Sequence, residues 1–221
     1  LDEKGIKDGV TIKIRKYIPV AAGMAGGSTD AAAVLVGVNR MFDLGFTKKE
    51  LMERGVKLGA DVPYCIMRGT ALSEGIGEIL TELPAPPQCH LVIAKPQISV
   101  STKAVYGKLR VNELAPEEHP DIDGMMAAIK NGDLDGVIER LGNVLETVTV
   151  PDHPEISEIK EIMVENGACG SLMSGSGPTV FGIYKDRELA EKACQALREA
   201  DGGRLTRQVY LTEFYNRKKA R

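Results

Sequence analysis

The sequence predicts an α+β fold divided into two lobes. Strand-like and helix-like segments alternate along the 221 residues, and the stretch Pro84-Ala85-Pro86-Pro87 separates an earlier group from a later one. The composition is 43% hydrophobic and 27% charged, which is ordinary for a globular protein with a buried core. We therefore expect a first domain over residues 1–86 and a second over residues 87–221.

The first lobe begins with a strand pattern and continues with two helices. Val10–Arg15 alternates apolar and polar residues, which is typical of a half-buried strand. Ser28-Thr29-Asp30 offers N-cap chemistry ahead of the helix-forming run Ala31–Met41. The remaining expected elements are a helix capped by Thr47 that ends near Leu58, and short strands at 62–67 and 69–72.

The second lobe carries clearer patterns. Ile156, Ile159 and Met163 fall on one face of a predicted helix over 155–166, which the glycine at 167 ends. The other expected elements are a strand at 91–94, several helices between 122 and 145, strands at 170–173 and 180–184, a helix at 187–199 and a strand at 208–212. Their β-α-β-β-α-β order matches a split βαβ, ferredoxin-like unit with extra helices inserted.

Charge and cysteine content narrow the class of function. A formal charge of −3 gives no basic excess of the kind that nucleic-acid binding requires. The four cysteines lack metal-ligand spacing and a disulfide framework, so a reducing cytoplasm fits best. No apolar run is long enough to span a bilayer. We expect a cytoplasmic protein, monomeric or homodimeric, without nucleic-acid or membrane partners.

The segment Pro19–Thr29 is the first of three that can carry chemistry. Its glycines let the backbone approach a ligand closely, and the helix that follows presents unpaired N–H groups to an anion. Ser28 and Thr29 can add hydroxyls to a phosphate or to its Mg²⁺. No Lys-Ser/Thr pair follows the glycines, so this is not a Walker A loop. On local chemistry alone, a small-residue helix entry used for tight packing is an equal alternative.

Two further segments contain reactive or ligand-binding side chains. Asp61, within Leu58–Pro63, can accept the proton of a hydroxyl that attacks phosphorus, although a helix or turn cap is the commoner role for one aspartate. Met173–Thr179 holds two glycines and two serines, which can bring backbone and hydroxyl groups to a ligand, with a hairpin turn as the alternative. Its spacing is not GxGxxG, which argues against a Rossmann site.

In this order, the three segments resemble those of the GHMP kinase superfamily. The resemblance extends to Gly59–Pro63, Lys95-Pro96, Val100–Tyr106 and Leu141–Glu146, and so covers nearly the whole chain. The form Ala22-Gly-Met-Ala-Gly-Gly27 is similar to that of the branch acting in the non-mevalonate isoprenoid pathway, and homoserine kinase is the alternative. The family fold is two-lobed, with ATP between the lobes.

The resemblance also implies roles for individual residues. It implies ATP and Mg²⁺ as cofactors, with no metal ligand from the protein, and makes Asp61 the catalytic base. The loop around the ATP phosphates would comprise Pro19, Val20, Ala21, Ala22, Gly23, Met24, Ala25, Gly26, Gly27, Ser28 and Thr29. Substrate contacts would come from Asp61, Thr102, Tyr106, Ser174, Gly175, Ser176 and Gly177.

Members of the family begin with further residues. These include a strand whose lysine contacts the reacting groups, and a histidine and an aromatic that bind cytidine. Lys4 and Lys7 lie in a polar, glycine-containing segment and do not fit the role of the lysine on that strand. We therefore expect this chain to be the C-terminal three-quarters of such an enzyme, with a partial first domain. A nucleotide-binding fragment without activity is a further alternative.

Overall fold

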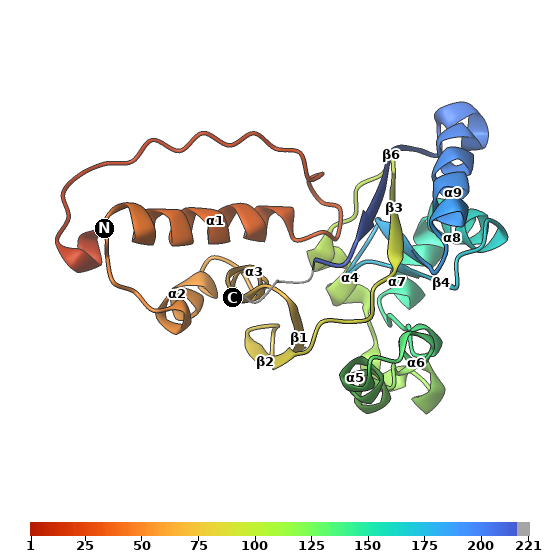
Figure 1. Ribbon diagram of the computed structural model, residues 1–221, viewed down its shortest axis with the longest axis horizontal. Coiled ribbons are helices and arrows are strands. Elements are labelled where there is room, and N and C mark those ends of the chain that lie inside the picture. The colour runs from red at the N-terminus through yellow and green to blue at the C-terminus, as the bar shows by residue number, and fades with distance from the viewer. Residues whose placement is uncertain (216–221) are drawn as a thin grey trace. The chain divides into compact units, whose positions relative to one another are not determined.

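The computed structural model describes residues 1–215 and consists of two compact units (Figure 1). The first unit holds Leu1–Val20 and Ala25–Leu83. The second holds the short segment Ala21–Met24 together with the chain from Pro84 onward. Among the described residues, no helix has the length and apolar character needed to cross a bilayer.

The first unit is mainly helical. Thr47 caps the second helix as predicted, because its hydroxyl accepts from the Glu50 N–H at 3.2 Å while the Glu50 carboxylate accepts from the Thr47 N–H at 2.8 Å. A small core of Ala32, Leu51, Val62 and Ile66 joins the three α-helices. In order, the elements are η1 (Asp2–Lys4), α1 (Gly26–Met41), α2 (Lys48–Gly55), α3 (Val62–Met67), and the antiparallel pair β1 (Thr70–Glu74) and β2 (Ile79–Leu83).

The predicted strand at Val10–Arg15 is wrong. The segment has no regular secondary structure, and Ile12 and Ile14 are 50% and 59% exposed. A strand needs backbone hydrogen bonds from a neighbouring strand. Within residues 1–215, none pairs with this segment.

Three other expectations for the first unit are corrected. Ser28-Thr29-Asp30 does not cap α1, because a left-handed Ala25 (φ 47°) starts the helix at Gly26. The apolar run 62–67 forms helix α3 and not a strand, since a short apolar run fits a buried helix equally well and a proline suits the first helical turn. Helix α2 ends at Gly55, short of the predicted Leu58.

The second unit is built on a four-stranded antiparallel sheet of order β4-β5-β3-β6. This is the order of a ferredoxin-like unit, so the predicted fold class is confirmed. Val92 in the central strand lies opposite Gly182 on one side and Leu211 on the other. The elements are β3 (His90–Pro96), α4 (Thr102–Lys108), η2 (Val111–Glu113), η3 (Pro116–Glu118), α5 (Ile122–Asn131), α6 (Leu134–Glu139), α7 (Glu146–Asp152), α8 (Glu155–Glu165), β4 (Gly170–Met173), β5 (Val180–Tyr184), α9 (Arg187–Glu199), η4 (Ala200–Gly203) and β6 (Thr206–Glu213).

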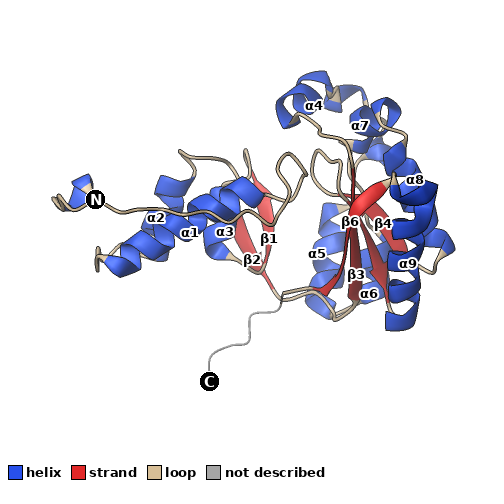
Figure 2. Ribbon diagram, turned by 90° about the horizontal axis from the view of Figure 1, so that it is seen from above, coloured by secondary structure: helices blue, strands red, loops and turns tan. Residues whose placement is uncertain are grey.

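Helices cover both faces of this sheet (Figure 2). α8 and α9 pack on one face, where Val92 and Ala94 of β3 meet the predicted helix stripe of Ile156, Ile159 and Met163, all fully buried. On the opposite face, Leu91 packs toward α6. Successive residues of a strand point to opposite faces, so β3 contributes to both cores. The sheet thereby fixes the β4–β5 hairpin, whose loop carries the third candidate segment.

Candidate active site

The candidate phosphate loop has an alternating backbone. Ala21, Gly23 and Ala25 all have positive φ, at 51°, 68° and 47°, and the intervening residues do not. Alternating right- and left-handed conformations turn successive N–H groups toward one side, which forms an anion-binding nest. Two of these three residues are alanines, for which a left-handed backbone is strained by about 1–2 kcal/mol each. The loop therefore holds a conformation that local preference alone does not favour.

The start of helix α1 adds further donors. The Thr29 N–H donates to the Ala25 carbonyl at 2.9 Å and so opens the helical ladder. In the described part of the chain, the amides of Gly26, Gly27 and Ser28 have no acceptor. These N–H groups and the positive end of a 16-residue helix dipole favour a negatively charged ligand.

The two hydroxyls of this helix start are not equivalent. Thr29 Oγ1 donates to the Ala25 carbonyl at 3.0 Å and lies 3.5 Å from the Cys65 Sγ. The Ser28 hydroxyl has no hydrogen-bond partner among residues 1–215. Ser28 is therefore the hydroxyl left available for a ligand, although the sequence does not distinguish the pair.

A lysine that the sequence analysis did not single out stands beside the same helix start. Lys16 forms an ion pair with Asp30, and its Nζ lies 3.1 Å from the position that a Cβ on Gly26 would occupy. A side chain at position 26 would also meet Ile18 at 2.9 Å, which explains the glycine there. In the sequence, the feature that could have pointed to Lys16 is its position three residues before Pro19, at the start of the candidate phosphate loop.

The loop Ser174–Thr179 contacts the middle of the phosphate loop. The Ser174 hydroxyl donates to the Gly23 carbonyl at 2.8 Å. A Cβ on Gly23 would lie 2.2 Å from the Ser174 carbonyl oxygen, so both close approach and a positive φ require glycine there. The loop is the β4–β5 hairpin turn and also contacts the candidate phosphate loop, while its role in ligand binding stays a prediction.

Helix α4 brings Thr102 to the same loop. The Thr102 and Ser176 hydroxyls are hydrogen-bonded at 2.8 Å. Tyr106, one turn later on the same face of the helix, is 60% exposed. The second unit thus brings Gly23, Thr102 and the loop Ser174–Thr179 together. Tyr106, on the same helix as Thr102, is exposed to solvent.

Asp61 lies in the first unit, at the N-cap position of α3. Its side chain makes no capping bond and no ion pair within the described residues, and it is exposed. The preceding Gly59 lies close to the start of α1, since a Cβ there would be 3.9 Å from the Ser28 hydroxyl. The segment that carries Asp61 therefore passes close to the start of α1, and the carboxylate is exposed and without a hydrogen-bond partner among the described residues.

Two neighbouring groups on α3 are held neutral. Burial raises the pKa of the Cys65 thiol; the contact with the Thr29 hydroxyl lowers it, and the nearby Asp61 carboxylate raises it. Burial also raises the pKa of the Tyr64 hydroxyl, which donates to the Gly69 carbonyl at 2.7 Å. Neither group is suited to act as a base near neutral pH.

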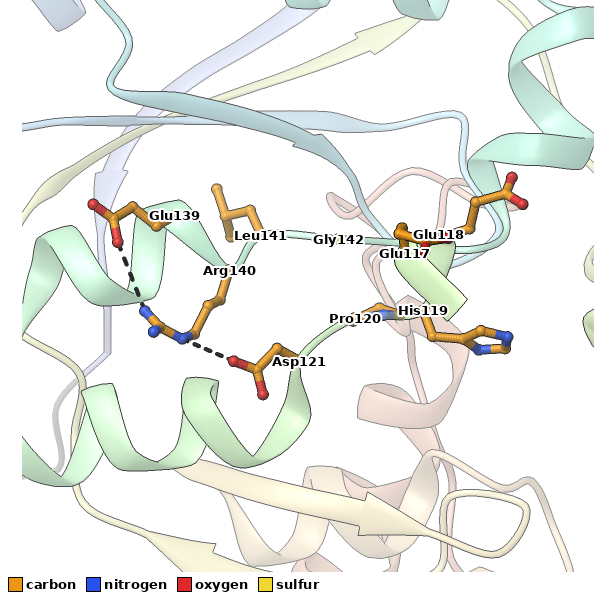
Figure 3. A pocket seen from close by; sticks show the side chains of 9 residues that line it. All are labelled: Glu117, Glu118, His119, Pro120, Asp121, Glu139, Arg140, Leu141 and Gly142. Atoms are coloured by element: carbon orange, nitrogen blue, oxygen red, sulfur yellow. Dashed lines mark hydrogen bonds and ion pairs between the residues drawn. The ribbon is translucent and has the colours of Figure 1, made fainter. Parts of the chain in front are cut away.

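A separate hollow of about 410 Å³ lies in the second unit (Figure 3). Its walls are Glu117, Glu118, His119, Pro120, Asp121, Glu139, Arg140, Leu141 and Gly142. Arg140 pairs with Asp121 at 3.1 Å and with Glu139 at 3.8 Å, so these charges satisfy one another. None of the residues predicted for the site lines this hollow.

The chain has a two-unit α+β fold with a glycine-rich loop at a helix start, and each unit matches a known family domain. The chain matches the GHMP kinases N terminal domain over residues 1–69 and the GHMP kinases C terminal domain over residues 125–202. The chain belongs to the GHMP kinase family, whose members are ATP-dependent small-molecule kinases.

Within that family, the similar curated proteins share one name. A 4-diphosphocytidyl-2-C-methyl-D-erythritol kinase from Lachnospira eligens is 56% identical over 207 residues, which cover 94% of this chain and 70% of that enzyme. The enzyme of the same name from Lachnoclostridium phytofermentans is 52% identical over 213 residues, covering 96% of this chain and 72% of its own length.

Solved structures show the same fold. A crystal structure of 4-(cytidine 5'-diphospho)-2C-methyl-D-erythritol kinase matches with a TM-score of 0.73 and 30% identity, covering 90% of this chain and 68% of that one. Homoserine kinase from Cytophaga hutchinsonii matches with a TM-score of 0.76 and 21% identity, covering 89% and 67%. At 21% identity, the similarity to homoserine kinase shows a shared fold only.

Proposed function

We propose that this chain transfers the γ-phosphoryl group of ATP to a hydroxyl of 4-diphosphocytidyl-2-C-methyl-D-erythritol, in non-mevalonate isoprenoid precursor biosynthesis. The observation that carries the proposal is the loop at 21–28, which has positive φ at three alternate residues and three amides without an acceptor among the described residues, in a chain 56% identical to a kinase of that name. Homoserine kinase, the alternative from sequence, shares only the fold at 21% identity.

The loop at Pro19–Thr29 is proposed to hold the ATP phosphates. Its alternating backbone and the free amides of Gly26, Gly27 and Ser28 fit a polyphosphate, and Lys16 adds a positive charge beside them. Mg²⁺ bound to ATP would neutralise part of the phosphate charge. Among the described residues, no three His, Cys, Asp or Glu side chains cluster to hold a metal. The Ser28 hydroxyl, which has no hydrogen-bond partner among residues 1–215, is the proposed side-chain contact for one of the phosphates.

Asp61 is proposed as the catalytic base. Its carboxylate takes the proton from the acceptor hydroxyl while that oxygen forms a bond to the γ-phosphorus and the bond to the β-phosphate oxygen breaks, releasing ADP. The role is supported by an exposed carboxylate that makes no capping bond, in a segment whose Gly59 lies close to Ser28 of α1. The remaining reaction depends on positioning and charge stabilisation, which backbone donors supply.

The acceptor alcohol is proposed to contact the second unit's cluster. Thr102 and Ser176 offer hydroxyls, and Tyr106 offers an exposed ring on which a pyrimidine base can stack. Gly175 and Gly177 keep the loop free of side chains, so the backbone can approach the ligand. These groups suit a substrate with both a base and a polyol part.

An ADP-release assay across three alcohols tests the substrate. We expect turnover with 4-diphosphocytidyl-2-C-methyl-D-erythritol to exceed that with homoserine or mevalonate by at least about 100-fold, or about 2.7 kcal/mol in transition-state binding. Equal rates with homoserine would overturn the substrate assignment.

The variant Asp61→Asn tests the base. We expect kcat to fall by at least about 100-fold, in the range of a lost general base. The thermal midpoint should stay unchanged, because the carboxylate makes no bond within the described residues. Asp43→Asn is the matched control, since Asp43 is an exposed aspartate of the same unit, and it should keep full activity. Near-normal turnover of Asp61→Asn would refute the assignment.

A further inference from the structure

The loop Ser174–Thr179 is held from behind by a motif to which the reaction assigns no role. This motif is Asn143–Glu146, between α6 and the first turn of α7. The proposed mechanism uses the loop, but nothing in it explains why the side chains behind the loop are an amide and a carboxylate. Their hydrogen bonds give an explanation.

Both the nitrogen and the oxygen of the Asn143 side-chain amide form hydrogen bonds at this position. Its Nδ2 donates to the Met173 carbonyl at 2.9 Å and to the Gly175 carbonyl at 2.8 Å. Its Oδ1 accepts from the Leu145 N–H at 3.0 Å, which fixes the orientation of the amide. Both amide hydrogens are thus used, and they tie together two carbonyls on either side of Ser174.

Glu146 secures the strand end that leads into the loop. One carboxylate oxygen accepts from the Met173 N–H at 2.7 Å, and the other accepts from the Lys160 Nζ at 2.6 Å. The side chains of Glu146 and Lys160 are 20% and 27% exposed, so solvent screens this pair only partly. Hydrogen bonds to a charged group are about twice as strong as neutral ones.

The far side of the loop contacts two separate parts of the proposed site. Ser174 donates to the Gly23 carbonyl in the phosphate loop, and Ser176 is bonded to Thr102 at the start of α4. Any shift of the loop backbone would therefore change both contacts together. Whatever fixes the backbone at residues 173–175 also fixes the nucleotide contact and the acceptor contact.

We infer that Asn143 and Glu146 are positioning residues for phosphoryl transfer. They set the backbone of the Ser174–Thr179 loop so that Ser174 holds the phosphate loop and Ser176 holds Thr102. The inference rests on the proposed function for its kinetic consequences. The hydrogen bonds that carry it do not depend on the identity of the substrate.

The variant Asn143→Asp tests the inference. It keeps the acceptor for the Leu145 N–H, removes both donors and sets a carboxylate against two carbonyls. Asn166→Asp is the matched control, because the Asn166 amide also donates to a backbone carbonyl, that of Ile162 at 2.8 Å, away from the loop. We expect Asn143→Asp to raise KM by at least about 10-fold for both ATP and the alcohol, and Asn166→Asp to change neither KM by more than about twofold.

A second variant separates positioning from a general loss of stability. Ser174→Ala removes the hydroxyl that bonds to Gly23 and keeps the Ser176–Thr102 bond, so it should raise KM for ATP by more than it raises KM for the alcohol. Because Asn143 acts on ATP through Ser174, the double variant should show the ATP effect of Asn143→Asp alone. Additive effects on KM for ATP would overturn the inference.

Amide hydrogen exchange gives a measurement that does not require turnover. The Ser174 N–H donates to the Thr179 carbonyl at 2.8 Å, and the Gly177 N–H donates to the Ser174 carbonyl at 3.0 Å. Their exchange should be at least about 10-fold faster in Asn143→Asp than in Asn166→Asp. If the unmodified chain shows no turnover, the proposed function fails, and this exchange rate still decides the inference. Unchanged exchange in Asn143→Asp would overturn it.

Discussion

Replacing Gly23 with alanine directly perturbs the contact between the phosphate loop and the serine-glycine loop. The new Cβ would lie 2.2 Å from the Ser174 carbonyl oxygen, and ordinary van der Waals contact begins at 3.4 Å. The two backbones would therefore have to separate by about 1.2 Å at this point. The Ser174 hydroxyl would then lose its 2.8 Å bond to the Gly23 carbonyl.

The expected cost follows from two contributions. A left-handed backbone costs alanine about 1–2 kcal/mol, and the lost hydrogen bond costs about 0.5–1.5 kcal/mol. Separation of the segment Ala21–Met24 from the loop relieves the clash, so most of this cost falls on ATP binding and little on the free energy of unfolding. A total of about 1.5–3.5 kcal/mol corresponds to ATP affinity weakened by about 10- to 400-fold.

The assay is ATP titration by calorimetry together with a thermal unfolding scan. Gly132→Ala is the matched control, because Gly132 has the same left-handed φ of 67° with no atom within 4 Å of its added Cβ. This control should lower the free energy of unfolding by about 1 kcal/mol and leave ATP affinity unchanged. If Gly23→Ala binds ATP within about threefold of the unmodified chain, the contact has no part in nucleotide binding and the reasoning is refuted.

Two further predictions concern the units separately. Thr47→Ala should lower the free energy of unfolding by about 1 kcal/mol in a denaturant titration, because it removes one half of the capping box on α2; an unchanged midpoint would show that the box does not stabilise the helix. Burial raises the pKa of the Cys89 thiol to about 11, so at pH 8 it stays protonated and unreactive. A thiol reagent should label the exposed Cys169 in the native protein and Cys89 only after unfolding, and equal labelling rates would contradict this.

The sequence predicts those elements whose signals are local. Strand β5 and helix α9 have the predicted bounds: α9 is strongly amphipathic over thirteen residues, and β5 is a five-residue run rich in β-branched and aromatic residues after a glycine-rich turn. The ferredoxin-like sheet follows from the order of such elements. Helices α4 and α7 were not predicted, since each has only seven residues and is stabilised by packing on the rest of the second unit.

Errors arose where distant contacts decide the local structure. Val10–Arg15 has a strand pattern but no pairing strand in the described part of the chain. The site shows the same limit. Glycine at position 23 is visible in the sequence, but its contact with Ser174, 151 residues away, is not. The roles of Asn143 and Lys16 likewise depend on contacts that no spacing rule predicts.

Analysis of the reaction product tests most directly whether this chain transfers the γ-phosphoryl group of ATP to the alcohol. The chain is incubated with ATP, Mg²⁺ and 4-diphosphocytidyl-2-C-methyl-D-erythritol, and phosphorus NMR follows the mixture. One new phosphomonoester resonance should grow in step with ADP, and neither should form at a comparable rate when Asp61 is replaced by asparagine. ADP formed without a phosphomonoester, or equal transfer by the Asp61→Asn variant, would contradict the proposed function.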